Sequence, residues 1–80
     1  MTEPTSAHHR RLEVDGVVLR RRLADVAVSI ACTEDQVAET LERMALAVPE
    51  DATRLLAHAE RARRFATLER DRAALLGIPR

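Results

Sequence analysis

The chain has 80 residues, enough for a single domain and too few for two. Its 13 basic residues balance its 13 acidic residues, so no net charge favours a polyanionic partner. The apolar residues are mostly alanine, leucine and valine, with Phe65 as the single aromatic residue, and we expect a thin, aliphatic core. Because such a core stabilises a small domain weakly, the composition favours a homo-oligomer.

The sequence also excludes several kinds of protein. It contains no run of about 18 apolar residues, the length that a membrane-spanning helix needs. Residues 1–11 lack the apolar centre of a signal peptide, and we therefore expect a cytoplasmic protein that does not contact membranes. Cys32 is the only cysteine, so an internal disulfide and a thiolate metal cluster are excluded.

The first residues show neither a helical nor a strand spacing. Residues 1–11 are polar and include a proline, and we predict a disordered tail. A single helical domain is expected over residues 12–80.

Residues 12–19 fit two structures. Asp15 and Gly16 lie between two apolar triplets, which is typical of a two-residue β-hairpin turn. In the helical alternative Asp15 is an N-cap, and apolar residues then follow on one helical face, at Leu19, Leu23, Val26 and Ile30. We favour a helix over about residues 16–31, because a lone two-stranded ribbon is marginally stable and no third strand is evident.

Two more helices are predicted after this one. Thr33 and Gln36 fit a capping box, in which the threonine hydroxyl accepts a hydrogen bond from the amide of the fourth residue, and a helix is expected over residues 33–47. Pro49 cannot continue that helix but suits the first turn of the next one, predicted over residues 49–76 and closed by Gly77. So short a connection makes the last two helices antiparallel. The predicted fold is an all-α, three-helix domain.

The last predicted helix is much longer than the helix over residues 33–47, so part of its apolar stripe has no cover from that helix. We expect homodimer formation through this helix. The candidate interface for the dimer or a protein partner comprises Leu55, Ala59, Ala62, Phe65, Ala66, Leu68, Leu75 and Leu76.

Charge is segregated along the chain. Residues 33–51 hold one arginine and six acids, a net charge of −5, whereas residues 52–80 hold seven arginines and three acids, a net charge of +4. We expect the two segments to complement each other. If arginines stay free, the candidate contacts to an anion or nucleic acid are Arg20, Arg21, Arg22, Arg61, Arg63 and Arg64.

No catalytic constellation is present. The sequence has no glycine-rich phosphate loop, no Cys/His cluster and no serine-nucleophile motif. We expect a non-enzyme without cofactor or metal, in which His58 is a half-exposed structural residue and Cys32 a small core residue.

One segment resembles a known motif. Residues 23–41 are similar to the helix-turn-helix of bacterial DNA-binding regulators, with Ala27 in the first helix, Cys32 at the turn and Thr33 as the cap. The resemblance implies a DNA-binding transcriptional regulator. However, the second helix of the motif would carry Glu34 and Asp35 with further acids, which repel the phosphate backbone.

These observations lead to one preferred function and one alternative. The absence of lysine and the abundance of alanine are typical of GC-rich bacterial genomes. We predict a small, non-catalytic bacterial regulatory or adaptor protein that acts through helix-to-helix contacts with itself and a protein partner. The alternative is a DNA-binding regulator of the helix-turn-helix type.

Overall fold

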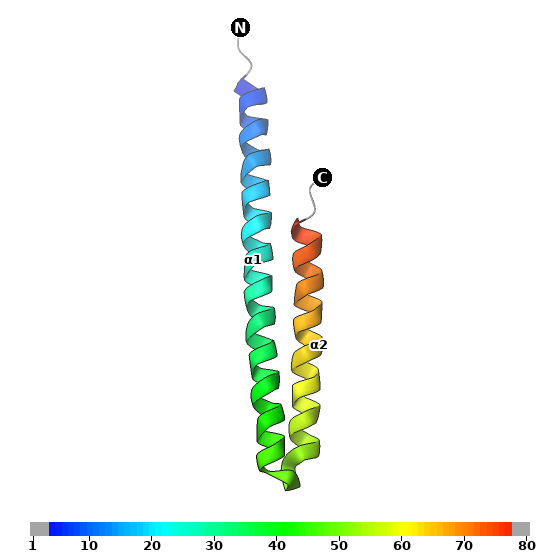
Figure 1. Cartoon of the computed structure of the whole chain (residues 1–80). Helices are drawn as coiled ribbons and strands as arrows, with labels where there is room; N and C mark the ends of the chain where they lie inside the picture. The colour runs from blue at the N-terminus through cyan, green and yellow to red at the C-terminus, as the bar shows by residue number, and fades with distance from the viewer. Residues whose placement is uncertain (1–3, 78–80) are drawn as a thin grey trace.

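The protein is a helical hairpin in which two helices lie side by side and run antiparallel (Figure 1). The computed structural model describes residues 4–77, and their side chains from His9 onward. Helix α1 spans Pro4–Ala47, a short 3-10 turn η1 spans Pro49–Asp51, and α2 spans Ala52–Gly77. The described residues contain no strand, so the all-α class is confirmed.

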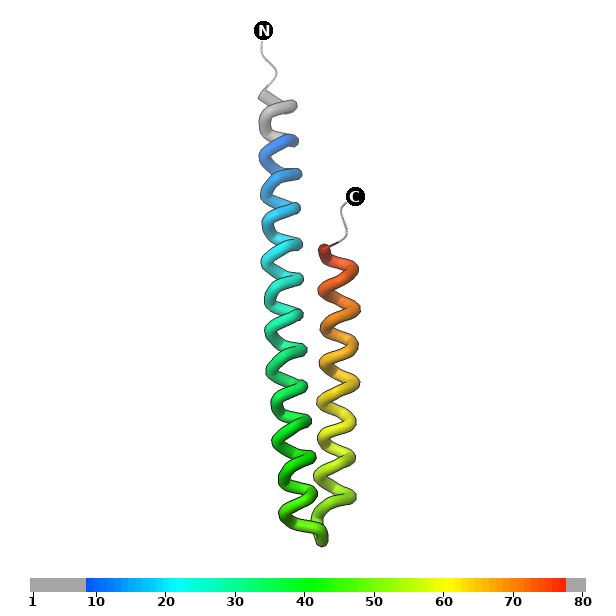
Figure 2. The backbone as a smooth tube through the Cα atoms, viewed as in Figure 1, coloured from blue at the N-terminus to red at the C-terminus, as the bar shows by residue number. Residues whose placement is uncertain are grey.

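Helix α1 is much longer than α2 and extends past its end. It has 44 residues against 26, and its N-terminal part stands clear of α2 (Figure 2). We call this part, residues 9–23, the overhang. The hairpin is 76 Å long and only 14 × 13 Å across, so nearly every side chain is near solvent.

The turn forms where the sequence predicts it. The amide of Val48 donates the last α-helical hydrogen bond, to the Met44 carbonyl at 2.9 Å, and Val48 then leaves helical geometry with φ −128° and ψ 76°. Pro49 follows, and its fixed φ suits the first turn of a helix. The Asp51 amide closes η1 on the Val48 carbonyl at 3.0 Å. The predicted antiparallel arrangement at this proline is confirmed.

The predicted break between residues 31 and 33 is wrong, since α1 continues through it. The Thr33 hydroxyl donates to the Ser29 carbonyl at 3.1 Å, one turn earlier, and does not cap a helix. Threonine makes this bond inside helices as readily as it caps them, so the local motif is ambiguous. The domain therefore has two long helices and not three.

The favoured helix at the N-terminal end is confirmed, and it is longer than predicted. Residues 12–19 are helical, so the alternative β-hairpin is absent, and Gly16 has no positive φ. The disordered tail predicted for residues 1–11 is instead helical from Pro4, and its first three residues lie outside the described part of the chain. Pro4 supplies a helix start, because proline is favoured at the first helical position.

The contact between the two helices is built mainly from alanine. Residues spaced alternately three and four apart are buried or half-buried in each helix, and we call them the inner seam. In α1 the inner seam comprises Ala24, Ala27, Ala31, Glu34, Ala38, Leu41, Ala45 and Val48. In α2 it comprises Ala52, Leu55, Ala59, Ala62, Ala66, Glu69, Ala73 and Leu76. A sustained seven-residue repeat of this kind is the pattern of a coiled coil.

Small and large residues alternate across the inner seam. Ala38 packs with Ala59 and Ala62, and Leu41 packs against the same cluster. Continuing the antiparallel spacing from this cluster places Leu55 opposite Ala45 and Leu76 opposite Ala24. Small residues let the helix axes approach closely, and the seam has no space for larger side chains.

Ala62→Leu is expected to destabilise the hairpin by about 1 to 3 kcal/mol, because it forces extra volume into this seam. Ala57→Leu, on the exposed side of α2, should cost much less. Urea denaturation followed by circular dichroism measures both. Equal tolerance of leucine at the two positions would show that the alanines do not control the packing.

The Thr33→Ala substitution distinguishes a continuous α1 from a helix that starts with Thr33 as its N-cap. Loss of an N-cap threonine typically costs about 1 kcal/mol, whereas alanine inside an exposed helix is favoured over threonine by a few tenths. We expect the melting temperature of Thr33→Ala to stay the same or rise slightly. A clear drop would indicate that a helix starts at this residue.

Candidate protein-interaction surface

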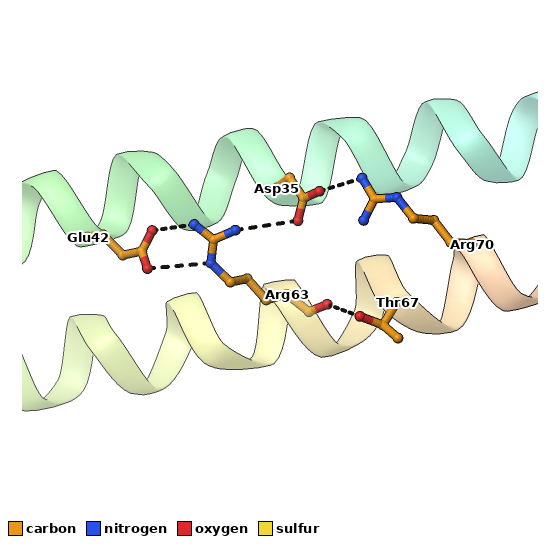
Figure 3. Close-up of polar contacts among 5 residues, drawn as sticks. All are labelled: Asp35, Glu42, Arg63, Thr67 and Arg70. Atoms are coloured by element: carbon orange, nitrogen blue, oxygen red, sulfur yellow. Dashed lines mark hydrogen bonds and ion pairs between the residues drawn. The ribbon is translucent and has the colours of Figure 1, made fainter.

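Two edges of opposite character flank the inner seam. On one edge, which we call the ionic edge, Asp35 and Glu42 of α1 face Arg63 and Arg70 of α2 (Figure 3). Arg63 donates through Nη2 and Nε to the two oxygens of Glu42, at 2.5 and 3.4 Å, and its Nη1 lies 3.7 Å from Asp35. Arg70 donates to the other oxygen of Asp35. The four side chains form one chain of ion pairs between the helices.

The ionic edge pairs acidic side chains of α1 with basic side chains of α2. The hydrogen bond to Glu42, followed by the charge of that carboxylate, raises the pKa of Arg63, and the hydrogen bond to Asp35 raises the pKa of Arg70. The arginines thus stay charged at every pH at which the hairpin is studied. Because all four side chains are partly exposed, each pair adds little to stability. The predicted charge complementarity of residues 33–51 and 52–80 is confirmed.

The opposite edge is apolar. The α1 residues that directly precede inner-seam positions Ala24 to Ala45 lie about 100° around the helix from them, and they form a second line whose alternating spacing continues through the overhang to Leu12. We call this line the outer seam. It comprises Leu12, Gly16, Leu19, Leu23, Val26, Ile30, Thr33, Val37, Thr40 and Met44. Seven of its ten members are large apolar residues, the other three being Gly16, Thr33 and Thr40, and every member except Gly16 is exposed.

Helix α2 continues the same apolar edge over its second half only. Phe65, Leu68 and Leu75 are exposed there, and exposed Arg72 lies between the two leucines in the same line. The corresponding positions in its first half are polar, with Arg54 and His58 among them. We use the name apolar edge for the outer seam together with Phe65, Leu68 and Leu75.

Shallow grooves lie along the apolar edge. One, between the two helices, is lined by Val37 and Leu41 of α1 and by Ala62 and Phe65 of α2, with polar residues at its rim. Another, on α1 alone, is lined by Val26 and Ile30 among polar neighbours. Such grooves can take the side chains of another helix.

The structure divides the candidate interface that the sequence predicts. Leu55, Ala59, Ala62 and Ala66 are buried against α1 of the same chain, and Leu76 is half-buried there. Only Phe65, Leu68 and Leu75 of the set are exposed. Most of the exposed large apolar side chains belong to α1, where the sequence analysis proposes no interface.

The candidate anion-binding arginines do not form one free surface. Arg63 is paired across the ionic edge, Arg64 lies 3.9 Å from Glu60, and Arg61 donates to Nδ1 of His58 at 2.7 Å. Arg20, Arg21 and Arg22 are separate from them, on the overhang. The turn implied by the helix-turn-helix resemblance is absent, because residues 23–41 belong to one continuous helix.

Cys32 is exposed on α1, so its expected role as a small core residue is wrong. Within residues 4–77 no three His, Cys, Asp or Glu side chains gather as a metal site would require, and no helix there is both long and apolar enough to span a membrane. Comparison with known protein families, curated proteins and solved structures finds no match.

The outer seam could be found in the sequence, because its alternating spacing is visible without coordinates. The part from Leu19 to Ile30 is visible as one apolar face of the helix predicted over residues 16–31. The predicted break at Thr33 hides its continuity with Val37 and Met44. The signal is one uninterrupted repeat, which outweighs a single local capping motif.

Arg63→Glu should destabilise the hairpin and lower its urea midpoint, because it places a third carboxylate beside Asp35 and Glu42. Adding Glu42→Arg should recover most of this loss by restoring one pair with reversed sign. Arg64→Glu is the control, since it changes the net charge equally and contacts only α2. A double variant no more stable than Arg63→Glu alone, measured by urea denaturation, would refute the role given to this pair.

Proposed function

We propose that the protein is a non-catalytic regulatory or adaptor module that acts by helix-to-helix contacts along its apolar edge, forming a homodimer and binding a protein partner. The observation that carries this proposal is the outer seam, on which seven of ten residues are large, apolar and exposed. An exposed apolar line of this length is unfavourable in water, and contiguous apolar patches on soluble proteins are typical of interaction sites. Its coiled-coil spacing suits another helix as the occupant.

The thin core supports the same proposal. Alanine buries little apolar surface, so the inner seam stabilises an isolated hairpin only weakly. Covering the apolar edge would add burial of leucine, isoleucine, valine and phenylalanine side chains, each worth about 1.5 to 3 kcal/mol when fully buried. Stability and association are then provided by the same surface.

The alternative function, DNA binding, has weaker support. Its candidate arginines on α2 are paired with groups of the same chain, and α1 carries acidic residues over 33–47. A phosphate backbone would be repelled by that segment. No observation favours this alternative over a protein partner.

Analytical ultracentrifugation at micromolar concentration tests self-association. The wild-type chain should sediment at about twice its mass of 8.9 kDa. Ile30→Glu should weaken the dimer at least about 100-fold, because each dimer loses two buried side chains and gains two desolvated charges. Circular dichroism should show that the helices remain.

Val28→Glu is the matched control. Val28 is 46% exposed and Ile30 38%, both on α1, but Val28 lies on the side of the ionic edge. The control should leave the dimer intact. A monomeric wild-type chain would refute self-association, and an equal effect of the two variants would refute the assignment to the apolar edge.

A further inference from the structure

We infer that the apolar edge is an interface with a second copy of this chain, packed antiparallel along the outer seam about a two-fold axis beside residues 26–30. This inference rests on the proposed self-association and specifies its partner, direction and register. Leu12 of each copy then lies opposite Met44 of the other. Four observations lead to this arrangement.

The first observation is the register of the outer seam itself. In an antiparallel pair of identical helices, the residue numbers of two facing residues add up to the same value in every layer. Coiled-coil layers form only at certain values of this sum. A sum of 56 pairs all ten members, in the layers Leu12 with Met44, Gly16 with Thr40, Leu19 with Val37, Leu23 with Thr33, and Val26 with Ile30. A shift of seven residues in either direction leaves Leu12 or Met44 without a facing residue.

The second observation is the change of character along α2. The inner seam places α2 beside residues 24–48 of α1, since Leu76 lies opposite Ala24 and Ala52 opposite Val48. With the two-fold axis beside residue 28, the α2 helices of the two copies overlap only over about residues 67–77. Leu68 and Leu75 fall inside this overlap, with Arg72 between them beside the two-fold axis, and Phe65 lies at its border. The polar first half of α2 has no facing helix, which explains why the apolar edge ends there.

The third observation is charge. In the antiparallel register Arg20 of one copy flanks the seam close to Glu34 of the other, and Asp15 lies close to Arg43, each pair occurring twice by symmetry. In a parallel pair, Arg20 of one copy would instead lie beside Arg20 of the other. The acidic residues 33–42 of the two copies would also lie beside each other. Like charges at such positions are unfavourable, so the charge pattern selects the antiparallel direction.

The fourth observation is area. The outer seam is about 48 Å long at 1.5 Å per residue. The ten large side chains of the apolar edge are 38 to 73% exposed. Full burial of such a side chain removes about 100 Å² from water, so covering the exposed half of each buries about 1,000 Å² in a two-fold dimer, the size at which specific interfaces begin.

Pairwise disulfide trapping tests the direction and the register together. Two variants are made in a Cys32→Ser background, one with Leu12→Cys and one with Met44→Cys. Each is incubated alone and mixed with the other, with oxidised glutathione as the oxidant. The mixture should give a linked dimer of the two different variants, and each variant alone should stay unlinked.

Val14→Cys mixed with Met44→Cys is the matched control. Val14 is exposed on the overhang but lies on the opposite side of α1 from Leu12. Linking through Leu12→Cys should be at least about tenfold faster than in the control, because docked thiols have an effective concentration in the millimolar range. Sedimentation of the same variants in reducing buffer reports the dimer independently of the cross-link.

The outcomes separate this inference from the proposed function. A disulfide between two copies of Leu12→Cys would show a parallel dimer and overturn the inference, while self-association would stand. A dimer in sedimentation with no link in the mixture would overturn the register. A monomer in sedimentation would overturn both.

Discussion

The close packing of alanine against alanine and leucine along the inner seam is the constraint on which the rest of the structure depends. Ten of the sixteen inner-seam residues are alanine, so the two helices are held at short distance and no bulky side chain fits between them. The larger apolar residues of α1 are displaced to the edge of the hairpin. The thin core and the exposed apolar edge therefore both follow from the alanines of the inner seam.

The ionic edge complements this packing. Asp35 and Glu42 of α1 lie seven residues apart, as do Arg63 and Arg70 of α2, so these charges repeat with the same period as the inner seam. They match the acidic part of α1 to the basic part of α2, and each exposed pair adds little to stability. Because like charges facing each other are unfavourable, these pairs contribute mainly to the choice of which segments pack together.

Glu69 shows how little apolar burial the hairpin itself achieves. It occupies an inner-seam position at 7% exposure, opposite a small alanine, and no buried polar atom among the described side chains lacks a hydrogen-bond partner. A carboxylate is tolerated there because the seam is so narrow that its oxygens lie near solvent. A core of this kind leaves the apolar edge as the larger source of hydrophobic free energy, which is the physical basis for the proposed dimer.

The amino-acid sequence by itself determined the helical class, the turn at Pro49 and the complementary charges of the two segments, because each depends on local chemistry or on simple counting. Only the tertiary structure decided that Thr33 lies within α1, because the same hydroxyl can cap a helix or bond back one turn inside it. It also decided which of two seams on α1 is internal. The inner and outer seams have the same spacing and lie one residue apart on α1. Helix α2 packs on the inner seam because its own alanines fit closely only against the smaller side chains of that seam.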